Sequence, residues 1–375
     1  MNNRQEPARC IHFDLNKIKP WSNLWLVTFS PPKTKALTIS NNRDRHENPQ
    51  IYFNNIPIDE VNTHCYLGLT FSYNLKWNAH IDNVTVKASQ RTNMMIPLKY
   101  KLDKTSLQTM YLTFVRPVME YGISVWGGTY DSNIVKLERV QIDALRIITG
   151  ATQRSNIANL YAEVNIPTFM ERRDTQMLMM MFKVKNNITP SSLSDLLPND
   201  HPVEHNYNLR RENHMNNPIP RLESTSRSFM YYAKNLWNNL SQNFKNTQSI
   251  SVFKKGIQNL KEQNVLYYYG KRWCNVHHSR IRMGCSKLNE DLCQNLHVKD
   301  SPTCACGSNT ETAKHYFMDC PLFIDERRNL VNTVTQITEF KLNTLLHGCP
   351  DLILQSNKHV FDAVHRYLKD TKRFE

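Results

Sequence analysis

The 375-residue chain is long enough for roughly two or three domains, and its 40 % hydrophobic content excludes disorder throughout. Lys and Arg outnumber Asp and Glu by 47 to 33, and this net charge of +14 favours a polyanionic partner. The nine cysteines are scattered, and no run of about 18 apolar residues occurs, so we expect no signal peptide, no membrane partner and a reducing nuclear or cytoplasmic location.

The predicted fold is mainly α with a small α+β part at the N-terminus. Residues 1–78 begin with a short helix near Ile11 and continue with β-rich runs separated by Pro, Asn and Gly. The runs cover residues 24–29, 36–39, 51–53 and 66–71. Strands 24–29 and 36–39 would have exposed edges if neighbouring strands are missing, so we expect this part to be the least stable.

Residues 79–198 have helical periodicity and predict a helical bundle. One helix covers residues 104–120 and should kink or end at Pro117, which lacks a donor N–H. Another covers residues 168–185, whose Met-rich stretch is typical of adaptable packing rather than of metal binding. A third ends at Gly150 and has one apolar stripe, formed by Ile134, Leu137, Val140, Ala144, Leu145 and Ile148.

Residues 199–220 are poor in large apolar residues and predict a linker. Residues 221–375 predict a separate helical domain, with helices over residues 226–240 and 251–263. A basic and aromatic stretch follows, which is typical of a surface that holds phosphates and stacks bases. The alternative is a solvated helix face with aromatic residues in the core. The predicted nucleic-acid contacts are Lys271, Arg272, His278, Arg280, Arg282 and Lys287.

The sharpest chemical signal is a CxCx8Hx4C motif over residues 304–320. Cys304, Cys306, His315 and Cys320 supply three thiolates and one imidazole, a ligand set that satisfies tetrahedral Zn²⁺. All four positions would be protein ligands, so the zinc would be structural and not catalytic. The alternative is three incidental cysteines and a surface histidine.

Several segments, taken in order, carry a resemblance to a known family. They are WLVTFSPPKTKALTIS (25–40), VNTHCYLGLTFSYNLKWNAHI (61–81), LQTMYLTFVRPVMEYGISVWG (107–127), KLERVQIDALRIITG (136–150), RSFMYYAKNLWNNL (227–240), RIRMGCSKLN (280–289), the Cys/His motif with CPLFIDER (320–327), and FDAVHRYLKDTKRF (361–374). Together they resemble the C-terminal part of reverse transcriptases of Jockey-like non-LTR (LINE) retrotransposons, the part that follows the catalytic motif.

The resemblance implies a remnant of the palm over residues 1–78, a thumb-like bundle over 79–198 and a zinc-knuckle domain over 221–375. It implies that Lys33 corresponds to a lysine that assists nucleotide incorporation, and that the turn with Tyr66 and Gly68 corresponds to the primer grip. The implied partners are RNA, DNA or a template–primer duplex held through its phosphates.

Polymerisation by two Mg²⁺ ions needs clustered carboxylates, which in this family include an Asp-Asp pair. No Asp-Asp dipeptide occurs in the sequence, so we expect no catalysis by this chain and Mg²⁺ only in the complete parent enzyme. Two functional hypotheses follow: a C-terminal fragment of an RNA-directed DNA polymerase, or a stand-alone nucleic-acid-binding protein derived from a retroelement. A decayed copy without function is the third alternative.

Overall fold

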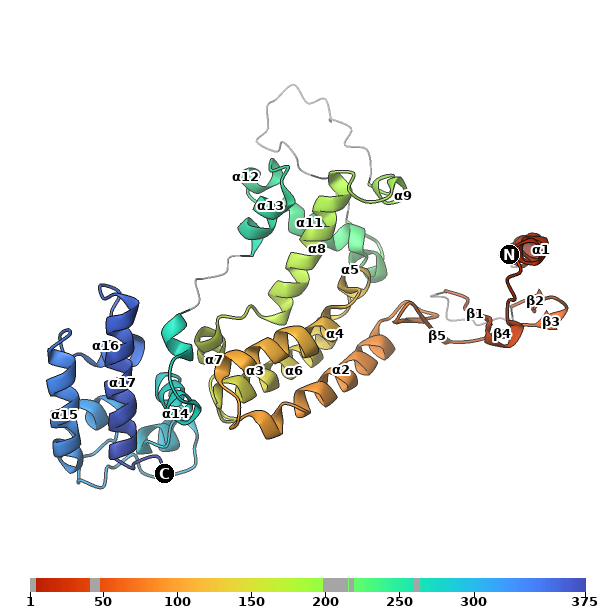
Figure 1. The fold of residues 1–375 in the computed structure, drawn as a ribbon. Helices are drawn as coiled ribbons and strands as arrows, with labels where there is room; N and C mark the ends of the chain where they lie inside the picture. The colour runs from red at the N-terminus through yellow and green to blue at the C-terminus, as the bar shows by residue number, and fades with distance from the viewer. Residues whose placement is uncertain (1–4, 41–47, 198–214, 216–218, 259–263) are drawn as a thin grey trace. The chain divides into compact units, whose positions relative to one another are not determined.

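The computed structural model describes residues 5–40, 48–197, 215, 219–258 and 264–375 (Figure 1). It is mostly helical, with 60 % helix and 5 % strand, which confirms the mainly α class. The chain divides into two compact units, Met1–Asn83 and Val84–Glu375, and each is described here by itself. Among the described residues, no helix has the length and apolar character needed to cross a membrane.

The described residues of the first unit, 5–40 and 48–83, form one long helix and three two-stranded sheets. Helix α1 covers Gln5–Leu24. The parallel pair is β1 (Lys35–Ala36) with β4 (Asp59–Glu60); the antiparallel pairs are β2 (Tyr52–Phe53) with β3 (Ile56–Pro57), and β5 (Thr63–Tyr66) with β6 (Leu69–Ser72). Many of its large apolar side chains are exposed, including Trp25 at 65 % and Leu26 at 91 %.

Two of the predicted strands in this unit are wrong. The run 24–29 is not a strand, because α1 extends to Leu24 and a turn with Leu26 at φ = +53° follows. The run 66–71 is interrupted by a two-residue turn, with φ = +46° at Leu67 and +79° at Gly68, and forms the β5–β6 hairpin instead. Apolar, β-branched composition did not distinguish a strand from a helix end or a hairpin.

The second unit is helical, and its first helices match the predicted bundle (Figure 1). The apolar stripe of α6 is buried as predicted, and Gly150 ends the helix in a left-handed conformation. Helix α8 begins with a capping box between Thr168 and Glu171. The bounds are α2 Asn78–Asn93, α3 Lys104–Met110, α4 Arg116–Glu120, α5 Ile123–Trp126, α6 Asp131–Thr149, α7 Ile157–Val164, α8 Phe169–Lys185 and α9 Ser191–Ser194.

The predicted interruption at Pro117 takes the form of a π-helical turn. Residues Tyr111–Val115 form this turn between α3 and α4, and the N–H of Arg116 donates to the carbonyl of Tyr111. Because Pro117 lies in the first turn of α4, its missing N–H leaves no gap in the hydrogen-bonding ladder. The chain therefore passes the proline without ending the helical layer.

The Met-rich stretch of α8 packs in a core, as predicted. Met177 and Met181 are fully buried and lie in one cluster with Trp237 and Phe253. These partners come from helices predicted near 226–240 and 251–263, while the proposed linker 199–220 lies almost entirely outside the described residues. The bounds of the helices in this segment are α10 Glu223–Ser226, α11 Phe229–Asn238, α12 Gln242–Lys245 and α13 Ile250–Ile257.

The C-terminal helices share a further core. Its centre contains Tyr316, Phe317 and Tyr367, each at most 2 % exposed, packed with Val360 and Leu330. The helices that contribute are α14 (Arg272–Arg282), α15 (Ile324–Thr335), α16 (Leu342–His347) and α17 (Leu354–Asp370). This core reaches the segment that carries the predicted zinc ligands.

Candidate metal centre

The first two cysteines of the motif flank one tight turn. The N–H of Gly307 donates to the carbonyl of Cys304 at 3.0 Å, and the N–H of Cys304 donates to the carbonyl of Ser308 at 2.9 Å. Gly307 has φ = +92°, which L side chains rarely adopt, although nothing lies within 4 Å of where its Cβ would be. Backbone conformation, rather than lack of space, therefore requires the glycine next to Cys306.

The other two ligands lie at the ends of one π-helical turn, η6 (His315–Asp319). The N–H of Cys320 donates to the carbonyl of His315 at 2.7 Å, which is the i to i+5 bond of a π-helix. At 3.6 residues per turn, an α-helix would place these two side chains about 140° apart around its axis. The wider π turn reduces this angle, so the imidazole and the thiol face the same point.

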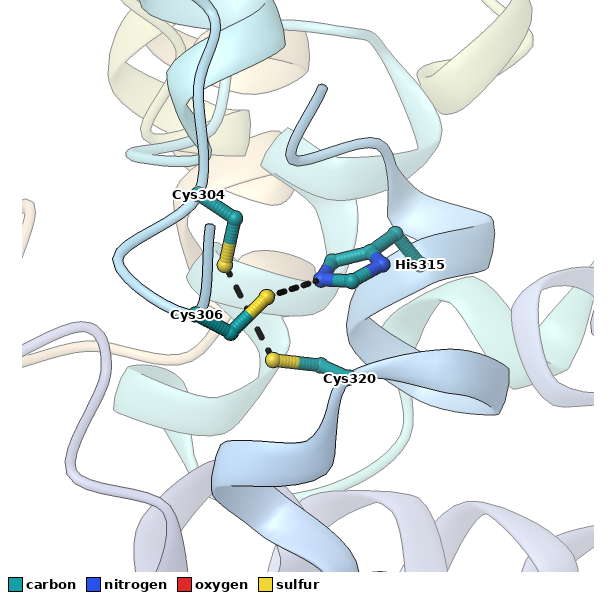
Figure 2. Close-up of side chains that lie close together, drawn as sticks. All are labelled: Cys304, Cys306, His315 and Cys320. Carbon is teal, nitrogen blue, oxygen red and sulfur yellow. Dashed lines mark hydrogen bonds between the residues drawn. The ribbon is translucent and has the colours of Figure 1, made fainter. Parts of the chain in front are cut away.

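All four predicted ligands converge, and Figure 2 shows their ligand atoms pointing toward one another. The four ligand atoms lie within 4.8 Å of one another, with 3.7 Å between the sulfurs of Cys304 and Cys320 and 3.3 Å from Cys306 Sγ to His315 Nε2. Tetrahedral zinc with bonds of about 2.3 Å to sulfur and about 2.0 Å to nitrogen needs separations of about 3.8 Å and about 3.5 Å. The two measured separations are close to those of a zinc shell, and a bound ion would draw together any ligand atoms that lie up to 4.8 Å apart.

The thiols differ in how readily they ionise. Burial raises the pKa of the Cys304 thiol and raises that of Cys320 to about 12, whereas the backbone N–H of Ser308 lowers the pKa of Cys306. A metal ion that binds all three sulfurs must displace the protons of the two buried thiols. Without a cation, the buried pair stays neutral.

Two arginines fix the backbone around the ligands. Arg327 donates to the carbonyl of Phe317 at 3.1 Å and also to the carbonyl of Cys320. Arg373 makes two hydrogen bonds, of 2.7 and 2.6 Å, to the carboxylate of Glu311, which is only 3 % exposed and lies between the two ligand pairs in the sequence. Sequence reasoning missed both arginines and Glu311, because none of them belongs to a ligand motif.

The ligand turn is attached directly to the C-terminal core. Tyr316 and Phe317 directly follow His315, are both fully buried and pack against the ring of Tyr367, with ring centroids 5.1 and 5.5 Å apart. The hydroxyl of Tyr367 donates to the carbonyl of Tyr316 at 2.6 Å. The cluster is therefore not an independent knuckle, because its π turn supplies two side chains of a hydrophobic core.

The predicted nucleic-acid contacts on α14 have partners inside the chain. Arg272 donates to the carbonyls of Lys99, Ile147 and Ile148 at 2.6 to 2.8 Å, and Arg280 donates to the carbonyl of Gly150 at 2.7 Å. These acceptors include the end of α6, where carbonyls lack helical partners and the helix dipole favours a cation. Both guanidinium groups are therefore engaged by the chain's own backbone.

His278 and Arg282 are also engaged internally. His278 is 1 % exposed and lies 3.0 Å from the carbonyl of Leu345 and 3.3 Å from Nε2 of His365, so a phosphate could not reach it. Arg282 donates to both carboxylate oxygens of Glu163 at 2.6 and 3.0 Å. Both belong to the packing of α14. Lys271 and Lys287 are exposed. Lys287 also donates to the carbonyls of Phe374 and Glu375, but its ammonium keeps a third N–H, so both lysines stay predicted nucleic-acid contacts.

His278 and His365, which lie 3.3 Å apart in the core, should make the fold acid-sensitive. Burial lowers the pKa of His365 to about 4 and lowers that of His278 well below its usual value, so both are neutral in the folded protein at pH 7. In the unfolded chain these two histidines bind a proton near pH 6.5. Their contribution to the free energy of unfolding is therefore complete above pH 6.5 and is lost as the pH falls towards 4. His365 alone accounts for about 3 kcal/mol. Urea unfolding from pH 7 to 4 measures this loss.

The matched variant is His365→Gln, which removes one of the titrating groups. It should show a shallower loss of unfolding free energy between pH 6.5 and 4 than the unmodified chain. An identical slope for the two proteins would contradict the assignment of acid sensitivity to this pair.

A buried charge network joins the bundle to α14. Glu163 of α7 accepts hydrogen bonds from Lys104 of α3 at 2.8 Å and from Ser279 at 2.6 Å, in addition to Arg282. Two cations face one carboxylate, and the rings of Tyr267 and Tyr268 lie 4.2 Å from Arg282 and 4.6 Å from Lys104. Sequence reasoning missed this network, because its members lie up to 178 positions apart, from Lys104 to Arg282.

In the first unit, the predicted residues lie at turns. Lys33 is exposed and ends the 3₁₀ helix Pro31–Lys33. Tyr66 is 62 % exposed and precedes the turn at the tip of the β5–β6 hairpin, where Gly68 has φ = +79°. The turn itself is present as predicted, while assistance by Lys33 and primer contact by Tyr66 and Gly68 stay predictions.

Comparison with known proteins identifies curated relatives from mobile elements of Drosophila melanogaster. A probable RNA-directed DNA polymerase from transposon X-element is 20 % identical over 158 residues, or 41 % of this chain and 17 % of the relative. A probable RNA-directed DNA polymerase from transposon BS is 25 % identical over 173 residues, 44 % of this chain and 19 % of the relative. The RNA-directed DNA polymerase from mobile element jockey is 23 % identical over 184 residues, 48 % of this chain and 20 % of the relative.

These homologues are RNA-directed DNA polymerases of non-LTR retrotransposons, which confirms the resemblance. Each of these matches covers at most 20 % of the relative's length. No family model and no solved structure matches the chain.

Proposed function

We propose that this chain is a C-terminal part of a retrotransposon RNA-directed DNA polymerase that binds nucleic acid and does not itself polymerise. The observation that carries the proposal is its relationship to RNA-directed DNA polymerases of mobile elements. The proposed partner is RNA, DNA or a template–primer duplex, contacted mainly through phosphates, because the chain has a net charge of +14. The proposed Zn²⁺ is structural, bound by Cys304, Cys306, His315 and Cys320.

The ligand chemistry supports a structural role for this zinc. Three thiolates and one imidazole fill a tetrahedral shell, which leaves no position for an activated water. The ion would hold the Cys304–Gly307 turn against the π turn, and thereby order Tyr316 and Phe317 in the C-terminal core. The chain's own residues would then position a basic surface rather than carry out chemistry.

Phosphate contacts predict a strong dependence of binding on salt. The zinc-loaded full chain should bind a labelled single-stranded RNA, with affinity lower by at least about tenfold at about 200 mM salt than at about 50 mM. Filter binding measures both affinities. No binding at the lower salt concentration, or an affinity independent of salt, would contradict the proposal.

A further inference from the structure

One aromatic side chain of α14 differs from its neighbours in having a solvent-exposed face. Trp273 is 37 % exposed, whereas His277, one helical turn later, is 7 % exposed and Phe374 is 1 % exposed. The ring centroids are 4.4 Å apart for Trp273 and His277, and 5.3 Å apart for His277 and Phe374. The exposed indole therefore packs against the buried ring of His277, which in turn contacts the ring of Phe374.

The three tyrosines before α14 do not share this property. Their hydroxyls contact His347 at 2.7 Å for Tyr267, the carbonyl of Val164 at 3.1 Å for Tyr268, and Asp362 at 2.8 Å for Tyr269. In the described part of the chain, the indole N–H of Trp273 has no hydrogen-bond acceptor, and its ring stays partly open to solvent. An amphipathic ring held rigidly at the surface is suited to stacking at low entropic cost.

Exposed lysines lie next to the indole in the sequence and beside Phe374. Lys271 lies two residues before Trp273, at the start of α14, and is exposed. Exposed Lys287 donates to the carbonyls of Phe374 and Glu375 at 2.8 and 2.9 Å. In addition, no side chain caps the first turn of α14, so its N–H groups favour an anion.

A planar ring bordered by ammonium groups matches the chemistry of a nucleotide with an unpaired base. The ring stacks on the base, and the lysines contact the phosphates on either side. A duplex offers phosphates but no free base face, except at its ends. We propose that Trp273, packed against His277 and accompanied by the exposed Lys271 and Lys287, is a stacking site for single-stranded nucleic acid.

This site deepens the proposed function and rests on it, and the test separates the two. The probes are a labelled oligouridine and a blunt RNA duplex of equal length, each bound to the zinc-loaded full chain. Trp273→Ala should weaken oligouridine binding by about tenfold and leave duplex affinity within about twofold. Trp273→Phe, the matched control, should retain most of the affinity because its ring still stacks. Lys271→Gln should lower the salt dependence of binding instead.

Tryptophan fluorescence gives a second readout, which reports on the indole itself rather than on affinity. Oligouridine should quench the unmodified chain, and Trp273→Phe should lose that quenching while it still binds. Equal oligouridine affinity for Trp273→Ala and the unmodified chain, or equal weakening of both probes, would overturn the stacking site and leave the proposed function standing. No binding of either probe by the unmodified chain would overturn both.

Discussion

Replacing Cys320 by Ser is expected to abolish zinc binding and to unfold the C-terminal core of the second unit. Cys320 ends the π turn whose residues Tyr316 and Phe317 are fully buried in that core. Structural zinc sites contribute an apparent binding free energy of roughly 10 to 16 kcal/mol. The whole free energy of unfolding of a typical domain is about 5 to 15 kcal/mol, so the two are comparable. Loss of one thiolate therefore removes the largest single stabilising interaction that we propose.

The measurement is zinc content together with thermal unfolding, with and without a chelator. The matched control is Cys349→Ser, because Cys349 is a half-buried free cysteine of the same unit outside the cluster. Cys349→Ser should keep one zinc and the unfolding temperature of the unmodified chain. A Cys320→Ser chain that retained one zinc and an unchanged cooperative transition would show that the cluster is not a metal site.

Glu163→Gln is expected to destabilise the chain by about 3 to 5 kcal/mol. The substitution leaves the buried cations Lys104 and Arg282 without their carboxylate, and breaking a buried pair costs more than its formation contributes. Nearby Arg282 and Lys104 lower the pKa of Glu163 to about 2 despite its burial, so the carboxylate is charged at pH 7. Urea unfolding at pH 7 measures the change.

The control for Glu163→Gln is Glu339→Gln, which removes an exposed carboxylate 2.7 Å from Lys341. It should change the unfolding free energy by less than about 1 kcal/mol, because exposed ion pairs contribute little. A Glu163→Gln chain as stable as the Glu339→Gln chain would contradict a role for the network in holding α14 to the bundle.

Features encoded locally were predictable from the sequence. The stripe of α6, the start of α8 at Thr168 and the convergence of four ligands within residues 304–320 each depend on spacing over at most a few turns. In these segments the local pattern and the tertiary fold agree, so periodicity and ligand spacing were sufficient. The convergence of the four ligands was predictable because all of them lie within 17 residues, from 304 to 320.

Features that depend on distant partners were not predictable. A basic stretch over residues 271–287 looks the same whether its arginines face solvent or bind carbonyls, and the acceptors of Arg272 lie up to 173 positions away. The same holds for Glu163, whose local helix gives no sign that it will face Lys104 and Arg282. The strand predicted at 24–29 failed because a short apolar run fits a helix end equally well.

We propose that zinc orders the C-terminal core of the second unit, and that this unit binds nucleic acid through its phosphates and through stacking on Trp273. The most direct test compares the affinity of the full chain for a labelled oligouridine with zinc bound, after removal of zinc by a chelator, and after zinc is restored. We expect salt-dependent binding by the zinc-loaded chain, at least about tenfold weaker binding by the metal-free chain, and recovery when zinc is restored. Equal affinity in all three states, or no binding by the zinc-loaded chain, would contradict the claim.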